Sequence, residues 1–218
     1  MDKMSNVNLI KEVECSVAIQ KKIPIRIISL NSIVDCLLLQ PIAEFLKANP
    51  HIKLELVTGK EQGPIYPGEI HIRSAIIQQK DIIKTELMNH KMTFVVSKEY
   101  LDLHGTPSNL DLLNRYDFLA YNPLNTFLEG HIWIDSDGSI SEPVFLSNSY
   151  AAILGMCLKG LGIAVLPDYS IKGYSLVEVL KDIDLEPTSI YLAYLNGGEN
   201  YPAVKETSEF LMKLLKKN

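Results

Sequence analysis

The 218-residue chain has few of the residues from which cross-linked or nucleic-acid-binding proteins are built. Its three cysteines, Cys15, Cys36 and Cys157, are odd in number and far apart, which excludes a disulfide scaffold and fits a reducing compartment. Its 21 basic residues are outnumbered by 26 acidic ones, and the only basic cluster is the terminal "KLLKKN". Such a tail more often forms the cationic end of a helix than a DNA-binding patch. Because a net charge of −5 repels phosphate backbones, we expect no direct DNA binding by this chain.

Long hydrophobic runs are missing too. No apolar stretch approaches the roughly 20 residues of a membrane span, and residues 1–22 have no signal-peptide core, so we expect a cytoplasmic protein without membrane contact. Signatures of catalysis are also absent. The five histidines are scattered, and there is no G-x-S-x-G turn, no Walker loop and no convincing pair of carboxylates. The sequence therefore predicts no metal site, no cofactor and no enzyme.

What the sequence does have is a regular alternation of strand and helix patterns, which predicts an α/β fold with largely parallel sheets. Strands are expected over residues 23–29, 51–57, 70–74, 118–121, 143–147, 163–167 and 189–195, with two more between 82 and 97 around Asn89-His90 and a hairpin-like segment around Trp133. Helices are expected over residues 6–20, 32–48 with a bend at Pro41, 148–160 and 203–217, with two short ones between 98 and 117.

The glycines of "CLKGLGIAVLP", residues 157–167, raise the question of a phosphate-binding loop. Such a loop needs the order strand, glycine turn, helix, so that free N–H groups of the helix face the anion. Here the helical pattern comes first and the strand follows. We therefore predict that Gly160 ends the helix in a left-handed conformation, and that Gly162 makes the tight turn into the strand.

Polar residues begin two helices directly after strands. Asn31 or Ser32 is expected as the N-cap of the first helix, and Asn148 or Ser149 as that of the helix in the middle of the chain. Either residue pair caps only its own helix, or the two helix starts face each other across a cleft and bind a small anion or polar ligand.

The order of these segments resembles the effector-binding domain of LysR-type transcriptional regulators. The likeness runs from about residue 23 to 216, and "KEYLDLHGTP" and "GLGIAVLP" are its most specific parts. The resemblance implies a fold like type 2 periplasmic binding proteins, with two Rossmann-like subdomains and a ligand cleft between them. It divides the chain into an N-terminal helix similar at most to the end of a linker helix (1–22), subdomain I (23–86 and 188–218) and an inserted subdomain II (87–187).

The resemblance also implies a set of effector-binding residues: Leu30, Asn31, Ser32, Ile72, Arg73, Ser74, Asn148 and Ser149. The guanidinium of Arg73 is suited to a carboxylate effector, since it can pair with one bidentately; an ion pair within the protein is the alternative. His71 stands where the family usually has a small residue, and it is either packed and hydrogen-bonded or a source of pH sensitivity.

The sequence departs from the family in two places. The proline-broken segment 58–68 replaces a helix, which puts the usual pairing of protomers in doubt, although the family implies a homodimer or higher oligomer. The winged helix-turn-helix that binds DNA is not in this sequence, so the chain is either part of a longer regulator or a stand-alone sensor. The alternatives to a regulatory domain are a solute-binding protein and an enzyme on the same fold.

Overall fold

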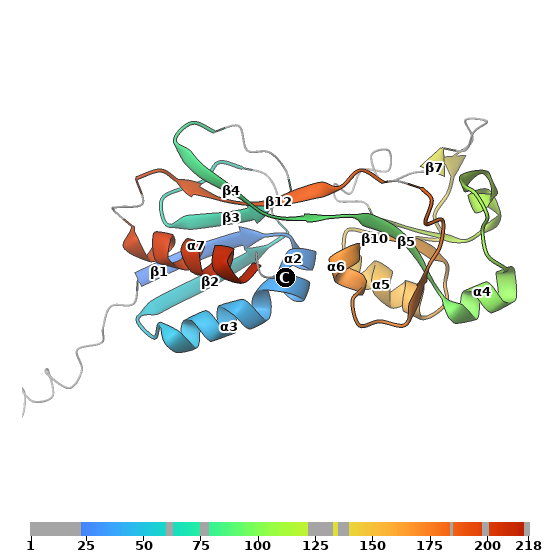
Figure 1. The fold of residues 1–218 in the computed structure, drawn as a ribbon, viewed down its shortest axis with the longest axis horizontal. Coiled ribbons are helices and arrows are strands. Elements are labelled where there is room, and N and C mark those ends of the chain that lie inside the picture. Colours follow the sequence, from blue (N-terminus) through green and yellow to red (C-terminus); the bar gives the residue numbers. More distant parts are fainter. Residues whose placement is uncertain are drawn as a thin grey trace, which may run out of the picture.

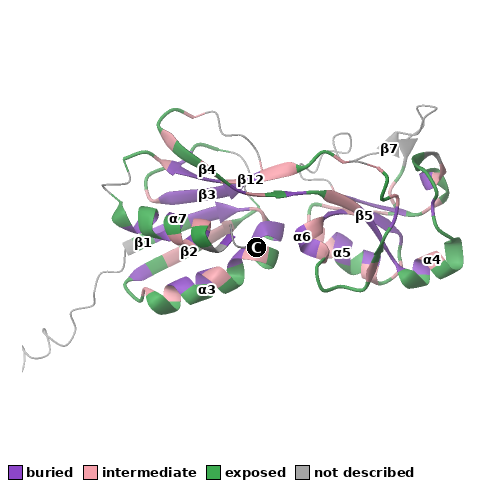
Figure 2. Cartoon of the chain, in the orientation of Figure 1, coloured by how far each residue is buried: buried purple, intermediate pink, exposed green. Residues whose placement is uncertain are grey.

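A computed structural model describes residues 23–59, 63–74, 79–121, 133–134, 140–183, 185–197 and 201–215. The helix expected over residues 6–20 lies outside these ranges. The described chain forms two α/β halves that lie end to end, each built on a five-stranded sheet (Figure 1). Buried residues lie along the strands and on one side of the helices (Figure 2).

The first sheet has the strand order β2-β1-β3-β12-β4. Its strands are β1 (Ile23–Ser29), β2 (Ile52–Thr58), β3 (Glu69–Arg73), β4 (Ile82–His90) and β12 (Thr188–Leu195). β1 pairs in parallel with β2 and β3, whereas β12 is antiparallel to β3 and β4. The polypeptide thus leaves this sheet along β4 and returns to it along β12.

One face of the first sheet carries the helices α2 (Asn31–Ile33), α3 (Leu39–Ala48) and α7 (Pro202–Leu215). Period-two alternation in β1 turns Ile25 and Ile27 into this core. There the rings of Phe45 and Phe210 pack with their centroids 4.8 Å apart. Between α2 and α3 lies a π-helical turn, η1 (Val34–Leu38). Pro41 has no N–H for the preceding turn, and the expected disturbance of the helix falls just before it.

The second sheet has the strand order β11-β5-β10-β6-β9. Its strands are β5 (Met92–Ser97), β6 (Phe118–Tyr121), β9 (Phe145–Ser147), β10 (Ile163–Pro167) and β11 (Leu176–Glu178). The helices of this half are α4 (Lys98–His104), α5 (Tyr150–Leu158), α6 (Asp168–Ile171) and the 3₁₀ helix η2 (Leu110–Arg115). The expected hairpin around Trp133 is present as β7 (Trp133–Ile134) paired with β8 (Ile140–Ser141).

The expectation of largely parallel sheets is wrong, because both sheets are mixed. In the second sheet β10 is parallel to β6 but antiparallel to β5, and β11 is also antiparallel to β5. The cause is the double crossing between the halves. β4 runs into β5 with only Lys91 between them, and β12 returns in the opposite direction. β4 belongs to the first sheet as far as His90, so the boundary proposed at residue 86 falls within a strand.

The glycine corner has the predicted form. Gly160 follows α5 with φ +74°, and Leu161 N–H donates to the Met156 carbonyl at 3.1 Å, which closes the helix. Gly162 has φ +159°, and a β-carbon there would lie 2.4 Å from the carbonyl oxygen of Asp117. The two glycines therefore end a helix and begin a strand.

Candidate functional site

A cavity of about 180 Å³ lies where the two halves meet. Its walls are formed by Leu30, Ile33, Ser74, His90, Met92, Tyr121, Tyr150, Pro167, Tyr169, Thr188 and Ile190. Leu30, Ile33 and Ser74 come from the first half, and Tyr121 and Tyr150 from the second. Both halves of the described chain therefore contribute to this cavity.

The cavity sits at the carboxyl ends of parallel strands, which is where α/β folds bind ligands. Leu30 follows β1 and Ser74 follows β3, while Tyr121 and Pro167 end β6 and β10. The two crossing segments supply the remaining wall, from the His90 region of β4 and the Thr188 region of β12. Parallel pairing in each half and the crossing strands between them therefore bring the lining residues together.

A buried hydrogen bond joins the halves beside this cavity. The hydroxyls of Ser32 and Tyr169 lie 3.1 Å apart, and either can donate. Ser32 is 7% and Tyr169 6% exposed, and burial raises the pKa of Tyr169 to about 12, so its hydroxyl keeps its proton. Figure 1 shows α2 and α6, which carry these residues, facing each other where the halves meet.

Two aromatic contacts shape the far wall. The rings of Tyr121 and Tyr150 stack with centroids 3.9 Å apart and planes within 8°. His90 meets Tyr169 edge to face at 5.2 Å. Burial lowers the pKa of His90 below its ordinary value, against the opposing influences of the Asp168 charge and a hydrogen bond with the Thr188 backbone. The wall is therefore aromatic, with an imidazole that is neutral at pH 7.

A family model described as the LysR substrate binding domain matches residues 20–216. The chain belongs to this family. Among curated relatives it is 29% identical over 140 residues to the HTH-type transcriptional regulator CrgA of Neisseria meningitidis, covering 61% of this chain and 46% of that protein. It is 29% identical over 177 residues to the uncharacterized HTH-type regulator YhjC of Escherichia coli, covering 74% and 58%. The chain thus spans about half the length of the curated relatives it matches.

Solved structures of the family share the fold. The CrgA regulatory domain superposes with a TM-score of 0.74 at 22% identity, covering 89% of this chain and 99% of that one. The full-length virulence activator AphB of Vibrio cholerae superposes with a TM-score of 0.75 at 22% identity, covering 97% and 77%. The expected two-subdomain, periplasmic-binding-protein-like fold of a LysR substrate-binding domain is thereby confirmed, and the halves are its subdomains I and II.

The structure places the eight expected site residues of this LysR domain differently from one another. Leu30 and Ser74 line the cavity. Ser32 does not line it but is hydrogen-bonded to Tyr169, which does. Asn31 and Asn148 are exposed and do not line the cavity. All eight remain predictions as ligand contacts.

The two expected helix caps differ in outcome. Ser149 is the N-cap of α5, as expected, and its hydroxyl accepts from Ala152 N–H at 3.3 Å. The expectation that Asn31 or Ser32 caps the first helix is wrong. Leu30 is the N-cap there and makes no side-chain cap bond, because the hydroxyl of Ser32 is used by Tyr169.

Ile72 and Arg73 lie away from the cavity. Ile72 is fully buried in the core of subdomain I. The guanidinium of Arg73 bonds to Nδ1 of His71 and to the carbonyl of Gly63, and His71 Nε2 bonds to Glu69 at 3.0 Å. Arg73 is thus held in a buried chain within subdomain I, on the face of β3 opposite Ile72.

The carboxylate of Glu69, which accepts from His71, is held in its charged form. Burial alone raises the pKa of Glu69, but hydrogen bonds from His71 and the Tyr66 backbone outweigh it and leave that pKa below its ordinary value. Arg26 lies 3.4 Å from the same carboxylate. Arg73, His71, Glu69 and Arg26 thus form one continuous series of hydrogen bonds and ion pairs within subdomain I.

Several cavity residues gave no signal in the sequence. His90 was read only as part of a turn between strands, and the tyrosines at 121, 150 and 169 are far apart in the chain. Their only local signal is position, since Tyr121 ends β6, Tyr150 begins α5 and Tyr169 is the second residue of α6. A search for polar or aromatic residues at every strand end would have found them.

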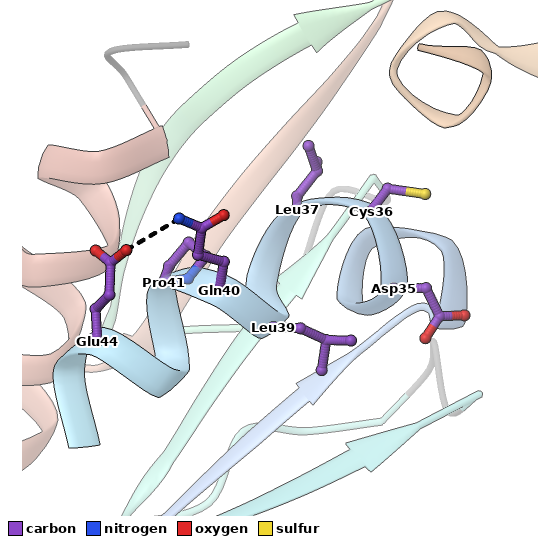
Figure 3. A pocket seen from close by; sticks show the side chains of 7 residues that line it. All are labelled: Asp35, Cys36, Leu37, Leu39, Gln40, Pro41 and Glu44. Carbon is purple, nitrogen blue, oxygen red and sulfur yellow. Dashed lines mark hydrogen bonds between the residues drawn. The ribbon is translucent and has the colours of Figure 1, made fainter. Parts of the chain in front are cut away.

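A second hollow runs along the helical segment Asp35–Glu44 (Figure 3). Its lining residues all come from this one segment, and Gln40 donates a hydrogen bond to Glu44 at 3.1 Å across the turn. It follows the π-helical turn, whose irregular backbone opens the surface. Because its described lining residues all belong to the continuous helical segment of η1 and α3, we take the cavity between the subdomains as the site.

The described ranges contain neither a candidate metal site nor a candidate membrane-spanning helix. No group of three or more His, Cys, Asp or Glu side chains there could hold a metal ion. No described helix is long and apolar enough to cross a membrane.

Proposed function

We propose that this LysR substrate-binding domain senses a small, anionic metabolite, for which a carboxylate is the leading candidate, in the cavity between its subdomains. The observation that supports this is the composition of the cavity wall, which both subdomains and both crossing strands provide. A ligand that contacts both subdomains binds one relative orientation better than others and shifts the population toward it. Such a shift is the physical basis of a regulatory output.

An anionic ligand is supported by the helix starts at the cavity. Tyr150 is the first residue of α5, and Leu30 immediately precedes the helical run that begins at Asn31. Backbone N–H groups at such positions favour negative charge. Ser74 adds a hydroxyl at the end of β3. Arg73 remains a candidate for the carboxylate only if its bond to His71 is exchanged for one to the ligand.

We further propose that the whole protein is cytoplasmic, acts as a homodimer or higher oligomer, and contacts DNA through a segment that this chain does not contain. The relatives it matches are named HTH-type transcriptional regulators. Sedimentation of the chain as a concentration-independent monomer would contradict self-association through this domain.

A thermal-shift screen tests the site. Small carboxylates, amino acids and aromatic acids are screened against the parent chain, Leu30→Trp, which fills the cavity, and Leu103→Trp, a control at an 82% exposed position. A ligand at about 100 times its Kd is expected to raise the Tm of the parent and the control by roughly 5 to 10 °C. Leu30→Trp is expected to lose this shift. A hit that stabilises Leu30→Trp equally places the ligand elsewhere.

A further inference from the structure

The described wall of the cavity is mainly apolar and aromatic, with a few uncharged polar groups. Among the described residues that line it there is no lysine, arginine, aspartate or glutamate. Its polar atoms are the hydroxyls of serine, threonine and tyrosine and the imidazole of His90. An imidazole nitrogen that carries no proton only accepts hydrogen bonds. His90 is therefore the side chain of this wall that can select a ligand with a hydrogen-bond donor.

His90 is only 7% exposed, and its Nδ1 has no hydrogen-bond partner among the described residues. Thr188 lies opposite His90 in the ladder of β4 and β12, and because Nδ1 is unpartnered we assign the ring proton to Nε2. A buried polar atom without a partner destabilises the folded state. An apolar side chain at position 90 would avoid this cost. A buried imidazole nitrogen without a partner therefore needs an explanation.

The surroundings of His90 keep Nδ1 an acceptor. Proton loss is favoured by the burial of the ring, while Asp168 at the start of α6 is the one charged group that opposes it. The neighbouring Tyr169 packs edge to face with the imidazole, and its hydroxyl carries its proton. With a proton on Nε2 and none on Nδ1, the imidazole offers a single acceptor at the cavity wall.

We propose that His90 determines effector specificity, because Nδ1 accepts a hydrogen bond from a hydroxyl or N–H group of a small, single-ring effector. This rests on the proposed function and adds the chemical class of the ligand. A volume of about 180 Å³ corresponds to roughly six water molecules, the scale of one ring with its substituents. Leucine, isoleucine, proline and tyrosine side chains surround the rest of the ligand.

Access to Nδ1 requires motion between the subdomains. The atom is buried even though the ring lines the cavity, and the Tyr169 ring from subdomain II packs edge to face with the imidazole. A donor therefore reaches Nδ1 when the wall carrying Tyr169 moves away from β4. Pairing with Nδ1 would then stabilise a relative orientation of the subdomains that differs from the unliganded one.

The test uses two probes that differ only in the donor, 4-hydroxybenzoate and 4-methylbenzoate, measured by calorimetry on the whole chain. The parent is expected to bind 4-hydroxybenzoate roughly tenfold more tightly, the effect of one hydrogen bond to a buried acceptor. His90→Phe, which keeps a ring but removes the acceptor, is expected to lose this preference. His90→Gln, which keeps an acceptor oxygen, is expected to retain part of it, and His104→Phe on the exposed α4 to retain all of it.

The outcomes separate the inference from the proposed function. Equal binding of both probes by the parent, or an unchanged preference in His90→Phe, overturns the role of His90. If that binding is still lost in Leu30→Trp, the site in the cavity stands. Failure of both probes to bind overturns the single-ring donor class, while a hit of another class in the thermal-shift screen would keep the proposed function.

Discussion

The hydrogen bond between Ser32 and Tyr169 should contribute measurably to stability, because it joins the subdomains and lies away from water. Both residues are at least 93% buried, and their hydroxyls are 3.1 Å apart. Removing one partner leaves the other hydroxyl buried and unsatisfied, which costs about 1–3 kcal/mol. We expect Ser32→Ala and Tyr169→Phe each to lower the free energy of unfolding by about 1–2 kcal/mol.

The double variant gives the sharper result. With both hydroxyls gone no polar atom is left unpaired, so Ser32→Ala/Tyr169→Phe should cost little more than either single change, and the coupling energy should be about 1 kcal/mol or more. Urea unfolding of the four proteins measures it. Thr207→Ala is the control, because Thr207 bonds only within α7, to Ala203, and its effect should add to that of Tyr169→Phe. A coupling below about 0.3 kcal/mol between Ser32 and Tyr169 would refute the reasoning.

Three further predictions follow from single positions. Gly162→Ala should lower the free energy of unfolding by at least about 2 kcal/mol, since its β-carbon meets the Asp117 carbonyl; Gly155→Ala, with open space around it in α5, should raise it by about 0.5–1 kcal/mol in urea titrations. His90 has a folded-state pKa below its ordinary 6.5, so the folded state binds fewer protons there and stability falls as pH drops from 6.5 through that lower pKa. His90→Phe should show a smaller loss of Tm between pH 7 and 5, and an identical loss would disprove this role. Burial raises the pKa of the Cys157 thiol to about 12, so it should react with iodoacetamide only as the chain unfolds; rapid labelling in the folded state, read by mass spectrometry, would contradict this.

Local rules were enough for the glycine corner and for most elements. Gly160 and Gly162 were placed correctly because the order of helix, glycine and strand is written in consecutive residues. The start of α5 at Ser149 follows the same kind of rule. These features depend on backbone conformation over a few residues, which a single sequence displays directly.

Features set by distant partners were harder to predict. Period-two patterns cannot tell parallel from antiparallel strands, so the mixed sheets were missed. Ser32 matched the rule for a helix cap, but its hydroxyl bonds to a residue 137 positions away. Arg73 was expected at the cleft from the family resemblance, whereas its contacts with His71 and, through it, Glu69 depend on the face of β3 that it occupies. In each case tertiary contacts outweighed the local preference.

The paired strands that join the subdomains have a mechanical consequence. His90 and Thr188 are the last facing pair in the ladder of β4 and β12, so the two crossing strands form a hydrogen-bonded two-stranded ribbon up to the point where they leave subdomain I. Such a ribbon resists bending within its own plane, where it would have to break backbone hydrogen bonds, and yields more readily to torsion. A ligand bound against this ribbon is therefore expected to change its twist. The change should be measurable as a rotation of α4 relative to α3.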